Sequence, residues 1–200
     1  MKKAKTLFNK VISMAENTDC HRFARSSYYC IALVNSCLDL KEEALKFAHK
    51  SFLESTAGFN FWYLGYRLLF LGQTYKNLKE VDKSFEMYQE AIEFAEQTHF
   101  TQVRAKALYG LAELYRGQED FTTALSHHLE SIALLDRIGA KCDLAEAYYQ
   151  LALTYQKMGL IDQSQENFDK AIQLFDEMEA PKQVEKVRRA IGFEGDAVGS

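Results

Sequence analysis

Hydrophobic residues recur at helical spacing on both sides of Gly159 in the segment LALTYQKMGLIDQSQENFDKAIQLF, residues 151–175. One stripe before the glycine consists of Leu151, Ala152 and Tyr155. A second stripe after it consists of Ser164, Phe168, Ala171, Ile172 and Phe175. Glycine is the residue type that most often ends a helix, because it adopts the left-handed conformation without strain. The segment therefore predicts two antiparallel helices joined by a short turn.

The same pattern returns along the chain at an interval of about 40 residues, which is typical of helical repeat proteins. Three copies align without a gap, with columns that include Leu71, Leu111 and Leu151, then Tyr75, Tyr115 and Tyr155, then Ala91, Ser131 and Ala171. A weaker upstream copy has Asn35 at the tyrosine column. We therefore expect a single repeat domain over residues 1–193, divided into a half unit at 1–17, units at 24–57, 64–97, 104–137 and 144–177, and a final helix at 181–193, followed by a flexible tail at 194–200.

These columns resemble the tetratricopeptide repeat, whose pattern is W-x2-L-G-x2-Y followed by A-x3-F and a proline. The matching stretches are YYQLALTY (148–155), LLFLGQTY (68–75), SQENF (164–168) and Pro181. The interval exceeds the usual unit of about 34 residues and resembles a long-unit subclass of the family. The resemblance implies an all-α fold, a right-handed α-α superhelix of about ten antiparallel helices.

In this family the first helix of each unit lines a concave groove, so the resemblance also implies a partner-binding surface. The implied groove residues are Tyr29, Tyr66, Leu69, Gln73, Lys76, Lys106, Tyr109, Glu113, Arg116, Glu146, Tyr149, Leu153 and Gln156. Their mixture of aromatic, amide and oppositely charged side chains suits a protein or peptide. We therefore expect a non-enzymatic binding module, either an adaptor or the sensor region of a larger regulator. The alternative is a peptide-responsive regulatory switch of a signalling or transcription system.

Several aromatic and terminal residues allow two interpretations each. Trp62 and Tyr66 either pack between units or act as interface anchors, since tryptophan and tyrosine are common in both settings. Tyr109 and Tyr149 either contact a peptide or pack against adjacent helices. The two ends of the array carry apolar residues such as Phe8 and Ile191. Because solenoid ends usually need polar caps, the terminal helices either form a homodimer, fray or are covered locally.

Composition narrows the classes of partner. Hydrophobic residues make up 48% of the chain and charged residues 26%, which is typical of a globular protein. The formal net charge of −4 disfavours nucleic acid as a partner, because nucleic-acid binding needs a clustered basic surface. The sequence has neither a membrane-spanning stretch nor the apolar core of a signal peptide. We therefore expect a cytoplasmic protein with no membrane partner.

The search for catalytic chemistry predicts no enzyme, no cofactor and no metal site. None of the common nucleotide-binding, hydrolase or metalloprotease motifs occurs. His127 and His128 are adjacent, so on a helix they point about 100° apart and do not chelate one metal. His128 shares a column with Tyr88 and Phe168, which predicts a histidine at the edge of the core. The four cysteines contain no CxxC pair and are expected to be reduced.

Overall fold

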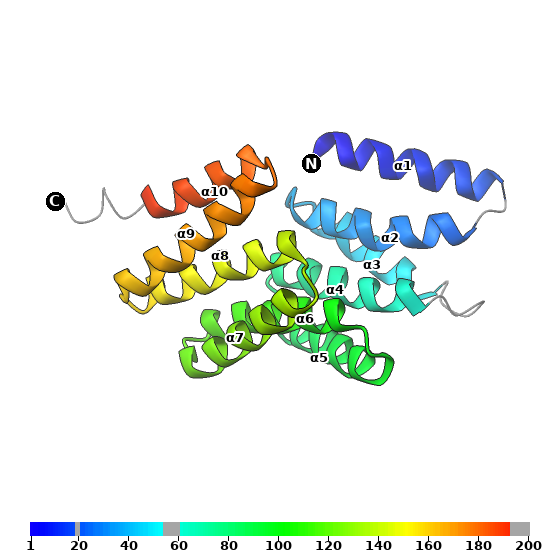
Figure 1. The fold of residues 1–200 in the computed structure, drawn as a ribbon. Coiled ribbons are helices and arrows are strands. Elements are labelled where there is room, and N and C mark those ends of the chain that lie inside the picture. The colour runs from blue at the N-terminus through cyan, green and yellow to red at the C-terminus, as the bar shows by residue number, and fades with distance from the viewer. Residues whose placement is uncertain (19–20, 54–60, 193–200) are drawn as a thin grey trace. The chain divides into compact units, whose positions relative to one another are not determined.

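Every element of regular secondary structure is a helix in the residues that the computed structural model describes, which are 1–18, 21–53 and 61–192 (Figure 1). The helices are α1 (Lys2–Asn17), α2 (His21–Ser36), α3 (Lys41–Leu53), α4 (Phe61–Asn77), α5 (Val81–Thr98), α6 (Thr101–Gly117), α7 (Phe121–Arg137), α8 (Lys141–Lys157), α9 (Ile161–Glu177) and α10 (Pro181–Gly192). They pack as antiparallel pairs, which confirms the predicted all-α repeat array. The side chains of residues 21–23, 53, 61 and 62 are not described. The side chain of Trp62 and the predicted tail at 194–200 therefore lie outside the described residues.

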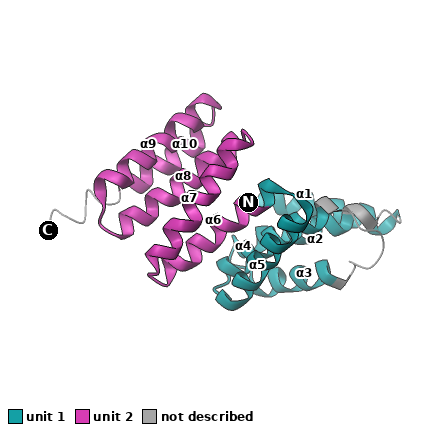
Figure 2. Cartoon of the chain, turned by 60° about the horizontal axis from the view of Figure 1, so that its bottom comes forward, with its two compact units in different colours: residues 1–103 teal, residues 104–200 magenta. Residues whose placement is uncertain are grey.

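The chain divides into two compact units, residues 1–103 and 104–200 (Figure 2). Unit 1 contains α1 to α5 and the start of α6, and unit 2 contains the rest of α6 and α7 to α10. Within the units, α2 packs on α3, α4 on α5 and α8 on α9. Each of these pairs begins with an even-numbered helix. We therefore call α2, α4, α6, α8 and α10 first helices, and α1, α3, α5, α7 and α9 second helices.

The period of the sequence is also the period of the backbone. The helices from α2 to α10 begin at equal intervals, at positions 21, 41, 61, 81, 101, 121, 141, 161 and 181, so one helix pair takes up one period of the sequence. The turns follow the same interval, since the left-handed positions, with φ between 53° and 74°, are Asp39, Lys79, His99, Glu119, Gly139, Gly159 and Glu179. At Gly159 this conformation ends α8, and the N–H of Leu160 donates to the carbonyl oxygen of Tyr155 at 3.0 Å. The predicted helix terminator is confirmed.

Small residues let the two helices of a pair approach closely, and serine hydroxyls join the helices by hydrogen bonds. In three pairs a serine of the second helix donates to a backbone carbonyl of the first helix: Ser84 to Gly72 at 2.8 Å, Ser131 to Ala105 at 2.8 Å and Ser164 to Ala152 at 3.0 Å. Large residues fill the space alongside, and Tyr88 and Phe168 are each 2% exposed. The cores of the α4–α5 and α8–α9 pairs thus combine close backbone approach with one large aromatic ring.

Asn35 marks the place where the repeat pattern is weakest. Its side chain on α2 is completely buried, and neither amide atom has a hydrogen-bond partner among the described residues. The equivalent residues Tyr75 and Tyr115 are half-buried instead. Because a buried amide without partners costs free energy, Asn35 weakens the interior of this pair.

Replacing Gly72 by alanine should lower the free energy of unfolding by about 1–3 kcal/mol, because the interior of this pair would be overpacked. A Cβ atom at Gly72 would lie 2.6 Å from Cε1 and 2.7 Å from Cδ1 of the Tyr88 ring. This clash should outweigh the helix propensity that alanine gains over glycine, about 1 kcal/mol. Urea unfolding followed by circular dichroism measures the change.

The matched control removes the ring that causes the clash. In a Tyr88→Leu background, Gly72→Ala should be neutral or stabilising, because only the helix-propensity gain remains. Ala112 and Ala152 occupy the same column in the later pairs, which shows that the fold accepts alanine there. A stabilising effect of Gly72→Ala in the presence of Tyr88 would contradict the prediction.

Candidate functional site

The predicted groove residues of unit 1 begin with a group of packed aromatic rings on α2 and α4. The Tyr29 ring is 8% exposed, and its centroid lies 5.5 Å from that of Tyr63 and 5.3 Å from that of Phe70. Burial raises the pKa of the Tyr29 hydroxyl to about 12. Tyr66 is half-buried, with its ring edge-on to Phe100 at 5.7 Å. Tyr63, Tyr66 and Phe70 stay partly accessible, and we call these three residues the aromatic patch.

The remaining groove residues predicted in unit 1 lie further along α4. Leu69 is 6% exposed and belongs to the core, whereas Lys76 is half-buried. The Gln73 amide donates to Oδ1 of Asn77 at 2.9 Å, and the Asn77 amide donates to Oγ of Ser36 on α2 at 3.0 Å. These side chains therefore link two successive first helices.

Unit 2 has a longer set of such links between its first helices α6, α8 and α10. Between α6 and α8, Lys106 forms an ion pair with Asp143, and Arg116 donates to the Gln150 carbonyl oxygen at 2.8 Å and to its Oε1 at 3.0 Å. Between α8 and α10, Nζ of Lys186 lies 2.9 Å from both carboxylate oxygens of Glu146, and Gln156 donates to the carbonyl oxygen of Ala190 at 3.2 Å. We call these four linked pairs the polar ladder.

The charged side chains of the polar ladder are paired but still reach solvent. The exposed fractions of the side chains are 25% for Lys106, 16% for Arg116, 27% for Glu146 and 39% for Lys186. Glu113, also a predicted groove residue, lies 3.7 Å from Arg116 and is 11% exposed. The Glu146–Lys186 ion pair is the more exposed one, and exposed ion pairs are weak enough for a ligand to replace them.

The two predicted tyrosines of unit 2 differ in burial. Tyr149 is 9% exposed and lies between Nζ of Lys186, 4.2 Å from its ring centroid, and the ring of Phe168 at 6.1 Å. Burial raises the pKa of the Tyr149 hydroxyl. Leu153 packs against the same core, whereas Tyr109 on α6 is half-buried. Packing thus accounts for most of the Tyr149 surface, and Tyr109 has more surface left for a ligand.

His128 lies deeper than the sequence predicts. It is completely buried, not at the edge of the core, and its Nε2 lies 3.0 Å from Oγ1 of Thr154 on α8. Burial, together with the positive charge of Arg116, lowers the pKa of His128 to about 3. His127 is half-buried with its ring 5.5 Å from that of Tyr115. The adjacent histidines therefore have separate surroundings.

Four residues of the polar ladder were missed by sequence reasoning: Asp143, Gln150, Lys186 and Ala190, the last of which contributes its backbone carbonyl. Lys106, Glu146 and Lys186 occupy the same column in three successive first helices, so the repeat frame contains the signal for Lys186. Asp143 and Gln150 lie outside the repeat columns of the predicted groove residues. Whether these two residues take part in ladder contacts depends on side-chain length and on the spacing of the helices.

The described residues contain neither a metal-binding cluster nor a membrane-spanning helix. No group of three or more histidine, cysteine, aspartate or glutamate side chains lies together in a way that could hold a metal ion. None of the helices in this part of the chain is long and apolar enough to cross a membrane.

Comparison with known sequences identifies the repeat. Sequence models of the tetratricopeptide repeat match residues 66–137 and 145–177, which together make up more than half of the chain. No curated protein matches the sequence.

Comparison with solved structures gives the same fold at low sequence identity. BtubC (BKLC) from P. vanneervenii is similar with a TM-score of 0.68 and 13% identity, over 100% of this chain and 92% of that one. Aspartyl phosphate phosphatase F from Bacillus subtilis has a TM-score of 0.75 and 15% identity, over 92% of this chain and 48% of that one. PlcR from Bacillus thuringiensis, solved with the peptide PapR7 and DNA, has a TM-score of 0.74 and 15% identity, over 92% and 69%. At these identities the likeness shows the fold alone.

Proposed function

This chain belongs to the tetratricopeptide repeat proteins, whose domains are typically protein-binding modules and usually non-catalytic, and we propose that it binds a protein or peptide on the exposed sides of its first helices. Its helix pairs exceed the usual unit of about 34 residues, which supports a place in the long-unit subclass. The proposal uses the polar ladder together with Tyr109 in unit 2 as the binding surface. The aromatic patch, which lies on the first helix α4 of unit 1, is a second contact surface.

The observation that carries the proposal is the partial exposure of paired charges of both signs on the polar ladder. A peptide offers carbonyl oxygens, amide hydrogens and charged side chains, and each can replace one partner of a ladder contact. Lys186 and Glu146 are suited to this exchange, because both reach solvent and meet across two successive first helices. A ligand that replaces such partners keeps the buried polar groups satisfied.

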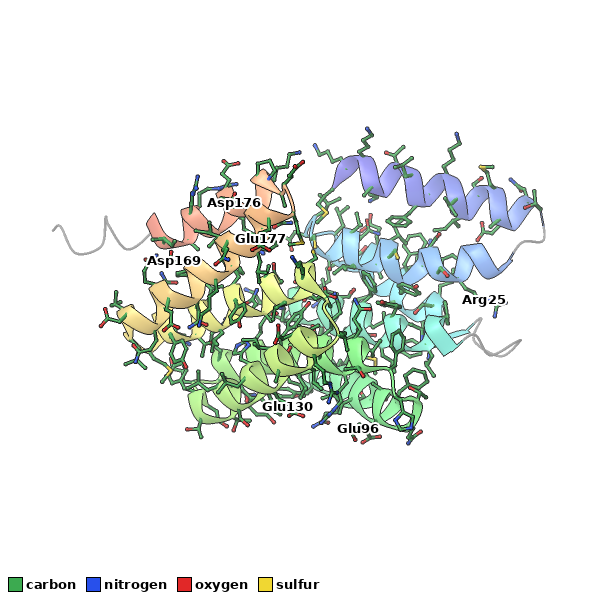
Figure 3. All side chains as sticks on the ribbon, in the orientation of Figure 1. Arg25, Glu96, Glu130, Asp169, Asp176 and Glu177 are labelled. Carbon is green, nitrogen blue, oxygen red and sulfur yellow. The ribbon has the colours of Figure 1, made fainter. Side chains whose placement is uncertain are left out.

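The distribution of charge over the helices supports the same kind of ligand. Figure 3 labels acidic side chains on the second helices: Glu96 on α5, Glu130 on α7, and Asp169, Asp176 and Glu177 on α9. All of these residues are exposed. The first helices of unit 2 instead combine Lys106, Arg116 and Lys186 with Glu113 and Glu146. A mixed surface favours a peptide over a polyanion, which needs uniformly basic surroundings.

A phage-displayed library of random peptides, selected on the immobilised chain, tests the proposal. Synthetic versions of the enriched peptides should bind the wild-type chain and lose affinity about 5- to 150-fold in Tyr109→Ala and Lys186→Ala, because a few central residues dominate such interfaces. Fluorescence anisotropy measures the dissociation constants. Circular dichroism should show unchanged helix content in both variants.

The matched control is Lys170→Ala on α9. Lys170 also forms an ion pair, with Glu166 at 2.6 Å, and it also lies over a tyrosine ring, 5.5 Å from the centroid of Tyr148. This substitution removes equivalent contacts outside the ladder and should leave affinity unchanged. The proposal fails if no peptide is enriched, or if the enriched peptides bind Tyr109→Ala and Lys186→Ala as tightly as the wild type.

The alternative is a peptide-responsive switch, and the polar ladder is the observation that favours it. Its contacts fix the spacing of α6, α8 and α10, so a peptide that replaces them would change that spacing within unit 2. Two proteins of similar fold are a phosphatase and a regulator solved with a peptide, although their identity to this chain is 15%. Spin-label distances between α6 and α10, with and without an enriched peptide, distinguish a switch from a rigid binding module.

A further inference from the structure

Helix α1 carries two apolar stripes, and only one of them is packed. Phe8, Ile12 and Ala15 pack against α2, and Ile12 and Ala15 are 7% and 4% exposed. A second stripe lies beside it, with Leu7 56%, Val11 39% and Met14 59% exposed. Their spacing of four and three residues is that of a seam between two helices. We call Leu7, Val11 and Met14 the open stripe.

The second helices α3, α5, α7 and α9 carry residues at the positions equivalent to the open stripe, and these residues are covered by the fold. The residues in the same repeat column as Val11 are Ser51, Ala91, Ser131 and Ala171, and all four are completely buried. Ser131 donates to the carbonyl oxygen of Ala105 on its own first helix α6. Of the residues equivalent to Leu7, Met87 and Asn167 are 5% and 7% exposed, and Phe47 and His127 are half-buried. The open stripe is therefore the face that a second helix packs against the first helix of its own pair.

No described helix of unit 1 occupies that place on α1. The helix pairs with α2, which is the first helix of the following pair. In each later pair the chain itself supplies a first helix that lies antiparallel to the second. The open stripe is thus a docking position shaped for one further helix.

The charges around the open stripe restrict the helix that fits. Lys2, Lys3 and Lys10 are exposed, and they form no ion pair among the described residues. The single carboxylate of α1, Glu16, is engaged by Lys50 at 2.6 Å and by the Tyr28 hydroxyl at 2.9 Å. This basic end contrasts with the acidic surfaces of α5 and α9. A helix that docks here needs acidic residues beside its apolar face.

The terminal helices of a second copy do not offer such a helix. Within the described residues no second helix follows α10, and its exposed residues Glu185, Arg188 and Arg189 stand where α8 has Ala145, Tyr148 and Tyr149. This face would place two arginines against the lysines of α1. A symmetric pair of α1 helices would likewise set lysine against lysine. Both arrangements bring like charges together, which disfavours association.

We propose that the open stripe of α1 binds an amphipathic helix with acidic flanks, supplied by a different protein. The helix takes the position that a first helix has in the later pairs and buries Leu7, Val11 and Met14, while its carboxylates pair with Lys3 and Lys10. This site is separate from the polar ladder and does not depend on the proposed function.

Two peptides derived from α8, the chain's own first helix, test the proposal. Both have the sequence of residues 141–157 with Cys142→Ser. The acidic probe also carries Lys141→Glu and Lys157→Glu, and the basic probe carries Asp143→Lys and Glu146→Lys. The acidic probe should bind the full chain at least about tenfold more tightly than the basic probe, since only it complements the lysines. Fluorescence anisotropy at low and high salt measures both affinities.

Variants of the chain locate the binding. Leu7→Ser with Met14→Ser should weaken binding of the acidic probe about 10- to 100-fold through loss of apolar contact. Lys3→Gln with Lys10→Gln should weaken it less and should remove its salt dependence. The control Leu129→Ser, at a position on α7 that is 54% exposed, should bind as the wild type does. All of these positions are exposed, so circular dichroism should be unchanged.

Three results would overturn the proposal. The first is failure of the acidic probe to bind at any concentration that anisotropy can reach, or equal binding of both probes. The second is light scattering that shows a dimer dissociated by Leu7→Ser with Met14→Ser, because the occupant would then be a second copy. The third is binding of the wild-type chain to phosphatidylserine vesicles that is lost in this double variant, because α1 would then serve a membrane surface.

Discussion

Replacing Phe168 by alanine should lower the free energy of unfolding by about 3–5 kcal/mol, the cost of truncating a buried aromatic residue and leaving a cavity. Phe168 is 2% exposed and packs in the α8–α9 core with Tyr149, Ala152 and Phe175. Its surroundings are fixed by the close approach of the two helices, so they cannot collapse into the space. Urea unfolding followed by far-ultraviolet circular dichroism gives the change.

The control for this truncation is Leu129→Ala on α7, where a large apolar side chain is 54% exposed. The free energy of unfolding should change by less than about 0.5 kcal/mol, because little apolar surface is lost from the interior. Similar losses for both variants would mean that burial does not determine the effect, and the assignment of Phe168 to the core would then be incorrect.

Mild acid should destabilise the protein through His128. The folded state lowers the pKa of this residue from 6.5 to about 3, so between these values the unfolded chain binds more protons than the folded chain. Stability is therefore lost as pH falls through this window, by about 1.4 kcal/mol per pH unit for a single group. Between pH 6.5 and pH 5, the wild type should lose about 1–2 kcal/mol from this source.

The variant His128→Phe removes the titrating group and keeps the aromatic residue found at the equivalent position Phe168. Its unfolding free energy should depend less on pH between 6.5 and 5, whatever its stability at neutral pH. His49→Gln, at an exposed histidine of α3, should follow the wild-type pH dependence. Parallel curves for wild type and His128→Phe would show that His128 is accessible to protons in the folded state.

The helix pairs and their period could be predicted from the sequence, because columns of large and small residues determine which faces pack. Leu151, Ala152 and Tyr155 recur in phase with their counterparts, and Gly159 ends the helix as its residue type suggests. The bonds from Ser84 and Ser164 to backbone carbonyls could not be predicted in the same way. A small residue was expected at those positions, but the direction of its hydroxyl depends on how closely two backbones approach.

Less of the candidate site could be predicted, for two physical reasons. The columns place Lys106, Glu146 and Gln156 on one side of the first helices, and the sequence therefore presents them as ligands for a partner. In the structure each of them contacts the next first helix, and whether it can reach depends on the distance between helices. The second reason concerns His128, whose depth of burial depends on the neighbouring helix. Its column suggested the core edge, but the residue is completely buried, and Nε2 lies beside Thr154 of the neighbouring helix while Nδ1 has no hydrogen-bond partner among the described residues.

The residues with a left-handed backbone conformation at the helix ends also determine how such a chain can be lengthened or shortened. Since Glu119 and Gly159 occupy equivalent turns, copying or removing residues 120–159 would create a junction with the same backbone geometry as the original ones. Insertion of one residue inside a helix would instead rotate everything that follows in that helix by about 100° and turn its buried columns toward water. Whole helix pairs can therefore be added or removed with every helix face kept in register.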